Sequence, residues 1–195
     1  MATTFTTTTD TRPAARTTPA AFRHPADPTV GMGLALTAIG MLFIALTSAY
    51  IVRQGIDPLW QTIRMPAILL FNTGILLASS LTLEQARRGA APSGDVPAAW
   101  LWATLALGLV FLAGQWMAWR QLSAAGVYLA SNAHSSFFYL LTALHGLHLA
   151  GGILALGWLC LRRATARHWV GTTAFYWHFM GGLWVYLLAL LFGWR

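Results

Sequence analysis

Three histidines in two hydrophobic segments are the residues of this sequence best suited to chemistry. His145 and His148 stand three residues apart, and His178 follows thirty residues after the second. Residues three apart share one face of a helix, so the pair can present two imidazoles together and His178 can supply a third ligand. Polar residues inside a bilayer are costly and point either to a functional site or to a specific packing role. The chemistry to weigh is therefore metal or haem binding.

The sequence offers few further ligands for either a metal ion or a haem. Intramembrane metal sites generally add carboxylate or thiolate ligands, but none of the five Asp and Glu residues lies deep in a hydrophobic segment, and Cys160 is alone. His134 and His148 have the fourteen-residue spacing of two stacked haem b ligands, yet no second segment repeats that spacing. We favour hydrogen-bonded structural histidines, and a metal or haem site through His145, His148 and His178 is the weaker alternative.

The composition identifies an integral membrane protein. Hydrophobic residues make up 57% of the chain and charged residues only 9%, with a mean hydropathy of +0.59. The net charge of +7 comes from arginines scattered along the chain, so nucleic acid binding is excluded. Ion-coupled transport is also disfavoured, because no charged residue lies deep in a span.

Five uncharged runs of helix length predict five membrane spans. Their approximate limits are 30–52, 65–84, 97–119, 135–161 and 170–193. Residues 121–134 read as a loop or interfacial turn. Residues 1–28, rich in Thr, Ala, Pro and Arg, are expected to form a disordered tail, and residues 29–195 the membrane domain. Eight arginines lie in the tail and in the loops after spans two and four, whereas the opposite side of the membrane carries four. Because basic residues gather on the cytoplasmic side, this distribution places the N-terminus in the cytoplasm and the C-terminus in the periplasm.

Small and polar residues recur on one face of each span, where they let helices approach closely and hydrogen bond. We expect the faces of the fourth and fifth spans to pack on each other or on a neighbour. The fourth-span face is Ser135, Thr142, His145, His148 and Gly152, and the fifth-span face is His178, Gly182, Tyr186, Ala189 and Gly193. Comparable faces hold Asn72 and Ser79 on span two, and Gly108, Gln115 and Trp119 on span three.

Two motifs resemble subunit III of the haem-copper respiratory oxidases, in both the cytochrome c and quinol branches. Phe138-Tyr139 followed by His145-Gly146-Leu147-His148 is similar to the family's H-G-x-H segment. Tyr176-Trp177-His178-Phe179 is similar to the Y/F-W-H-F opening of its last helix. With weaker matches at Gly31-Met32 and Asn72-Thr73, the resemblance covers about residues 31–193 and fits the short, five-helix bacterial form.

The resemblance implies an accessory, non-catalytic subunit III of a bacterial haem-copper terminal oxidase in aerobic respiratory electron transport. Haem and copper are then expected in partner subunits and not in this chain. The chain would pack on subunit I, its main contact, and on subunit II, in a hetero-oligomeric complex or supercomplex of the bacterial inner membrane. Spans one and two would lean away from the other three in a V-shaped cleft that holds phospholipid.

The residues expected to matter fall into two groups. The first group carries the family signature in a structural role and binds no metal: His145, Gly146, His148, Trp177, His178, Phe179, Asn72 and Gln115. The second group lies at predicted span ends and is expected to meet lipid headgroups: Arg53, Arg64, Arg120, Trp60 and Trp119.

Three positions depart from the family pattern. Ile39, Ala118 and Gly181 stand where the family usually carries acids. The departures argue against a role in supplying protons. They also leave open a subunit III-like accessory protein of a nitric oxide reductase or of another respiratory complex.

Overall fold

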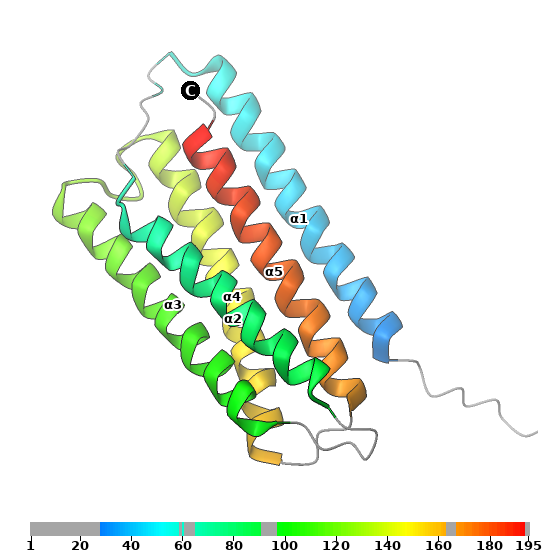
Figure 1. The fold of residues 1–195 in the computed structure, drawn as a ribbon. Helices are drawn as coiled ribbons and strands as arrows, with labels where there is room; N and C mark the ends of the chain where they lie inside the picture. The colour runs from blue at the N-terminus through cyan, green and yellow to red at the C-terminus, as the bar shows by residue number, and fades with distance from the viewer. Residues whose placement is uncertain (1–27, 59, 61–64, 91–96, 163–166, 194–195) are drawn as a thin grey trace, which may run out of the picture.

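The computed structural model describes residues 28–58, 60, 65–90, 97–162 and 167–193. These residues form five long helices: α1 Pro28–Ile56, α2 Ile68–Arg88, α3 Ala98–Ala124, α4 Ala133–Arg162 and α5 Arg167–Gly193 (Figure 1). Each is long and apolar enough to cross a membrane. The predicted all-α fold with five spans is confirmed. The expected disordered tail lies, up to residue 27, outside the described residues.

Several helices run past the uncharged segments that predicted them. α2 continues through Glu84 to Arg88, and α3 reaches Ala124, so the predicted loop 121–134 shortens to residues 125–132. The last turn of a spanning helix can carry charged residues, because it extends out of the hydrocarbon toward the lipid headgroups. An uncharged run therefore gives the length of the helix inside the hydrocarbon and not the length of the whole helix. Local capping fixes the connection to α4. Gly126 ends α3 with φ +78°, and the Asn132 Oδ1 accepts from the Ser135 N–H at 2.7 Å.

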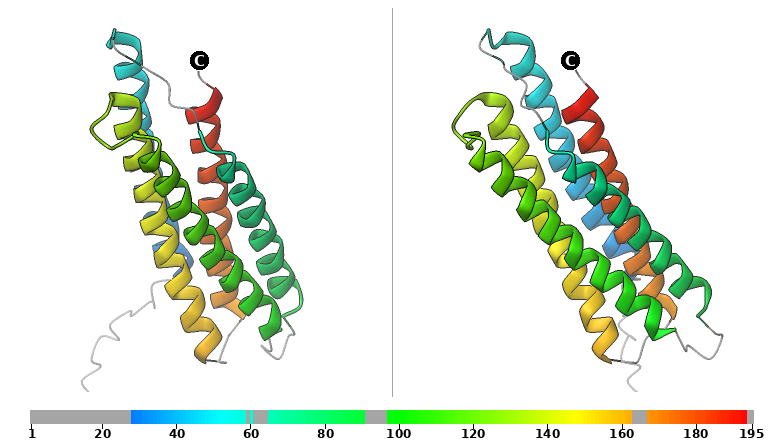
Figure 2. Two further views of the ribbon diagram at one scale, coloured as in Figure 1. Left: turned by 90° about the vertical axis from the view of Figure 1, so that its left-hand side faces the viewer. Right: turned by 60° about the vertical axis from the view of Figure 1, so that its left-hand side comes forward.

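Helices α2 to α5 form a four-helix bundle, and α1 lies outside it (Figures 1 and 2). The most extensive contact joins α2 to α3, whereas α1 contacts α4 and α5 and has no contact with α2 among the described residues. The expected pairing of spans one and two as one arm of a V is therefore wrong. The polar residues of α2 are engaged by α3 and α5, which leaves no comparable face for α1.

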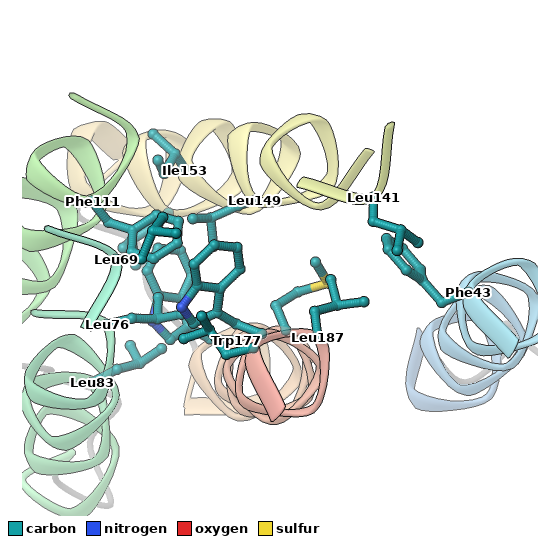
Figure 3. Close-up of a cluster of buried hydrophobic side chains, with 14 of the residues drawn as sticks. Phe43, Leu69, Leu76, Leu83, Phe111, Leu141, Leu149, Ile153, Trp177 and Leu187 are labelled. Carbon is teal, nitrogen blue, oxygen red and sulfur yellow. The ribbon is translucent and has the colours of Figure 1, made fainter. Parts of the chain in front are cut away.

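The core consists of large apolar side chains between α2, α3, α4 and α5. Leu69, Leu76 and Leu83 recur every seven residues along α2 and are at most 1% exposed. Figure 3 shows Trp177 reaching from α5 toward this row and toward Leu149 of α4. Lipid tails are as apolar as these side chains, so helix association here depends on close packing and hydrogen bonds, not on escape from water.

The buried face of α5 is not the predicted one. His178, Gly182, Tyr186 and Ala189 are exposed, so of the two expected packings, on span four or on a neighbour, the packing on span four is not found. The buried face instead carries large side chains, among them Trp177, Met180, Trp184, Leu187 and Leu191. Large side chains gain more dispersion contacts in the centre of a bundle than a stripe of small residues does. The predicted face of α4, by contrast, is buried except at His148, which is half-buried.

Candidate functional site

A layer of polar contacts near the middle of the bundle ties α2 to α3 and α5. The Asn72 Nδ2 donates to the backbone carbonyl of Phe111 at 2.8 Å, and the Trp184 Nε1 donates to the Thr73 Oγ1 at 3.0 Å. Asn72 is 1% exposed, so its bond is shielded from competing donors. Neighbouring residues 72 and 73 thus bind two different helices.

His145 belongs to the same layer but is held by packing. It is fully buried, with its ring centroid 6.0 Å from that of Phe111 on α3 and 5.0 Å from that of Trp184 on α5. Within the described residues, neither ring nitrogen has a hydrogen-bond partner, and the same is true of the amide of Gln115. The hydrogen bonds expected for His145 are therefore not found among the groups that the structure describes.

His148 faces a different neighbour and does not converge with His145. Its ring lies edge-on to Phe43 of α1, with centroids 5.9 Å apart, and its Nδ1 is 2.7 Å from the carbonyl oxygen of Leu144. The Tyr176 hydroxyl donates to the backbone carbonyl of His148 at 2.6 Å. This bond joins α4 to α5, and the phenyl contact brings in α1.

Glycines of α4 and α3 give the signature aromatics room. A Cβ at Gly152 would lie 2.9 Å from the Tyr176 ring, and one at Gly108 would lie 2.8 Å from the Trp177 indole. A Cβ at Gly146 would lie 4.0 Å from Leu112, an ordinary contact. Gly152 and Gly108 therefore permit close approach, whereas Gly146 tolerates a methyl group on steric grounds.

Trp177 is the largest buried side chain of the signature group. It is fully buried, and its Nε1 donates to the Ser79 Oγ of α2 at 2.9 Å. Three residues after Ser79, the Thr82 hydroxyl lies 2.8 Å from the Thr104 hydroxyl of α3. This is a second hydrogen bond between α2 and α3, besides that of Asn72. The indole thus combines a large packing contribution with a satisfied N–H.

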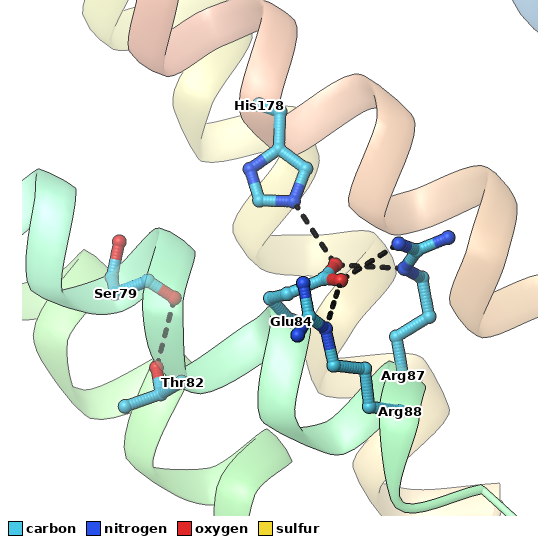
Figure 4. A network of polar contacts seen from close by, with 6 residues as sticks. All are labelled: Ser79, Thr82, Glu84, Arg87, Arg88 and His178. Atoms are coloured by element: carbon cyan, nitrogen blue, oxygen red, sulfur yellow. Dashed lines mark hydrogen bonds and ion pairs between the residues drawn. The ribbon is translucent and has the colours of Figure 1, made fainter.

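Glu84 is a site residue that the sequence analysis missed. Its carboxylate accepts from the Arg87 Nε and Nη2 and from the Arg88 Nε, all at 2.7 Å, and lies 3.7 Å from the His178 Nε2 (Figure 4). The spacings of three and four residues to the arginines were visible in the sequence. The approach of His178 was not, because it depends on α2 packing against α5. Phe179, the residue after His178, packs on α1, where a Cβ at Gly40 would lie 3.7 Å from the Phe179 Cζ.

The two tryptophans expected to meet lipid headgroups face the protein. The Trp119 Nε1 donates to the Thr142 Oγ1 at 3.1 Å, and the Trp60 ring packs edge-on to Tyr50 and His134 at 5.2 and 5.4 Å. Both indoles are half-buried. Their part in headgroup binding stays a prediction.

The arginines proposed for headgroups differ in setting. Arg120 is exposed at the end of α3, and Arg64 lies outside the described residues. Arg53 lines a pocket of about 930 Å³ between the end of α1 and the start of α4, and its Nη2 lies 3.2 Å from the Asp57 Oδ2. Polar lining from Ser131, Asn132 and Ser136 faces apolar lining from α1.

Residues 29–195 match the family model for cytochrome c oxidase subunit III. The chain belongs to this family. It is 29% identical to cytochrome c oxidase subunit 3 of Synechocystis over 87% of this chain and 76% of that one. It is 30% identical to the subunit 3 of Thermostichus vulcanus over 88% and 90% of the two chains. It is also 34% identical to a probable subunit 3 of Nocardia farcinica, over 62% and 63%.

Membership of the subunit III family makes this chain a multi-pass membrane protein and an accessory subunit of a haem-copper oxidase, in a complex with other oxidase subunits. No group of three His, Cys, Asp or Glu residues close enough to hold a metal ion occurs in the part of the chain that the structure describes. The three signature histidines accordingly contact three different sets of neighbours.

The three departures from the subunit III pattern lie at helix contacts. Ile39 is half-buried on α1, and Ala118 is fully buried on α3. Gly181 is buried on α5, where a Cβ would lie 3.5 Å from the Ser80 Oγ of α2. Among the described carboxylates, Glu84 alone lies inside a helix, one turn from its end.

Proposed function

We propose that this chain is subunit III of a bacterial haem-copper terminal oxidase in the inner membrane, packed on subunit I and touching subunit II. Haem and copper then lie in those partners, and this chain stabilises the complex during turnover. The observation that carries the proposal is the match of residues 29–195 to the subunit III family, in order and over nearly the whole chain. The arginine distribution favours a cytoplasmic N-terminus.

The outer surface suits a subunit that is surrounded by lipid and larger partners. Large apolar side chains of α1, such as Leu34, Met41 and Ile44, are each about two-thirds exposed. Their exposure is unremarkable for a helix in lipid, because hydrocarbon solvates them as well as protein does. The small residues exposed on α5, Gly182 and Ala189, would let a partner helix approach closely.

We further propose that the pocket at Arg53 binds a phospholipid. The guanidinium can hold the phosphate, because an exposed Arg near the bilayer surface pairs readily with it. An acyl chain can follow Ala49 and Val52 along α1.

Purification from the native membrane tests the first proposal. An affinity-tagged chain should bring down oxidase subunits I and II in near-stoichiometric amounts, with haem and copper in proportion to subunit I. Recovery of nitric oxide reductase subunits instead would favour the alternative accessory role. Recovery of the chain without any haem-copper subunit would contradict both.

Lipid analysis of the purified complex tests the pocket. Arg53→Gln should lower the amount of anionic phospholipid that copurifies, because the neutral amide no longer pairs with phosphate. Arg88→Gln, at the opposite end of the bundle, is the matched control. Equal lipid content in the wild type and both variants would contradict a specific site at Arg53.

A further inference from the structure

Several buried side-chain atoms of the described residues have no hydrogen-bond partner among those residues, the Asn72 Oδ1 among them. Four of these atoms belong to two residues of neighbouring helices: the Oε1 and Nε2 of Gln115 on α3 and the Nδ1 and Nε2 of His145 on α4. Gln115 is 3% exposed and His145 fully buried. In a spanning segment no bulk water reaches such groups, so an unpaired buried donor or acceptor carries its full desolvation cost.

The helix register brings the two side chains to the same level. On α3, Gln115 lies one turn from Phe111 and one turn from Trp119, on the same face. Trp119 bonds to Thr142, and Phe111 packs on His145, three residues further along α4. Gln115 therefore lies between two residues of α3 that both contact the same short stretch of α4, residues 142–145.

A direct bond between the two side chains would satisfy only half of their atoms. A neutral imidazole offers one donor and one acceptor, and the amide offers its NH₂ and its oxygen. One contact between them leaves the second ring nitrogen and the other amide atom unpaired. A water molecule donates twice and accepts twice, and buried waters typically make about three hydrogen bonds to such groups.

We propose that Gln115 and His145 form an internal water-binding site between α3 and α4, closed on the α5 side by Trp184. The water accepts from the amide N–H and donates to the amide oxygen and to the ring nitrogen that faces Gln115, so that three of the four atoms are paired. This site gives His145 a hydrogen bond that the described residues do not, and it holds α3 to α4 at mid-membrane. The inference is independent of the oxidase assignment.

Radiolytic labelling of the purified membrane complex tests the site. X-ray pulses make hydroxyl radicals from water in place, so a buried side chain is oxidised only where a bound water lies beside it. Trp184, 1% exposed and packed on His145, should be oxidised several-fold more than Trp177, which is equally buried and likewise hydrogen-bonded to α2 but lies two helical turns away on α5. Equal oxidation of the two tryptophans in the wild-type protein would overturn the proposal.

A double variant provides the second arm. His145→Phe with Gln115→Leu removes all four polar atoms while keeping a ring and a branched apolar chain, so Trp184 oxidation should fall to the level of Trp177. Persistent oxidation of Trp184 in that variant would show that the water is held elsewhere, and would also overturn the site. The wild-type comparison of the two tryptophans does not depend on the variant folding.

Discussion

Replacing Gly114 by alanine should break the contact between α2 and α3. A Cβ at Gly114 would collide with the Asn72 Oδ1 and lie 2.7 Å from the Asn72 Cγ. Asn72 cannot simply move aside, since it is buried and its Nδ2 donates to the carbonyl of Phe111 at 2.8 Å. Either the two helices separate or the amide rotates and loses its bond.

The expected loss follows from these two routes. Overpacking of a tight contact costs about 1–3 kcal/mol, and a buried amide left without its partner costs about 1–3 kcal/mol. Gly114→Ala should therefore lower the free energy of unfolding by about 1–3 kcal/mol if one of the two effects acts and by about 2–6 kcal/mol if both act. Titration of the purified protein with SDS in mixed micelles, followed by tryptophan fluorescence, measures the change.

Two further variants make the measurement decisive. Gly74→Ala is the matched control on α2, because no atom of the described residues lies within 4 Å of its added Cβ. Alanine in a helix should be neutral or stabilise by about 0.5–1 kcal/mol. Asn72→Ala removes the group with which the methyl collides, so Gly114→Ala should cost much less in that background. A loss at Gly114 no larger than at Gly74, or one unchanged by Asn72→Ala, would refute the reasoning.

Three other substitutions test separate contacts in the same SDS titration. Trp177→Phe should cost about 1–3 kcal/mol, because it removes the donor to Ser79 and part of a buried ring; no loss would mean that the bond is not formed. Glu84→Gln should cost at most about 1 kcal/mol, because the side chain of its partner Arg87 is half exposed, and a larger loss would indicate a desolvated network. Gly126→Ala should cost about 1 kcal/mol through its φ of +78°, and a neutral result would show that the loop changes conformation.

The spans and the buried face of α4 could be predicted because each depends on one helix alone. An uncharged run of sufficient length marks a span whatever its neighbours, and the spacing of Thr142 and His145 marks one face. The ends of α2 and α3 were less visible, since a charged residue such as Glu84 marks the edge of the hydrocarbon and not the end of the helix.

Contacts between helices could not be predicted, because they depend on which spans become neighbours. The small residues of α5 formed the expected seam in the sequence, yet the bundle buries Trp177 and Trp184 on the other face. The pairing of His178 with Glu84, and the packing of His145 between Phe111 and Trp184, likewise require the tertiary arrangement.

The position of α1 outside the bundle has a consequence for synthesis in the membrane. Its neighbours in the structure are α4 and α5, and α4 begins only at Ala133. During translation α1 must therefore reside in lipid without any helix of its own chain to contact, and it is the most apolar of the five spans. α2 is the least apolar, but its most extensive neighbour, α3, follows it directly. Of these two spans, the more apolar one is therefore the one that must remain longer in lipid before its neighbours in the structure are inserted.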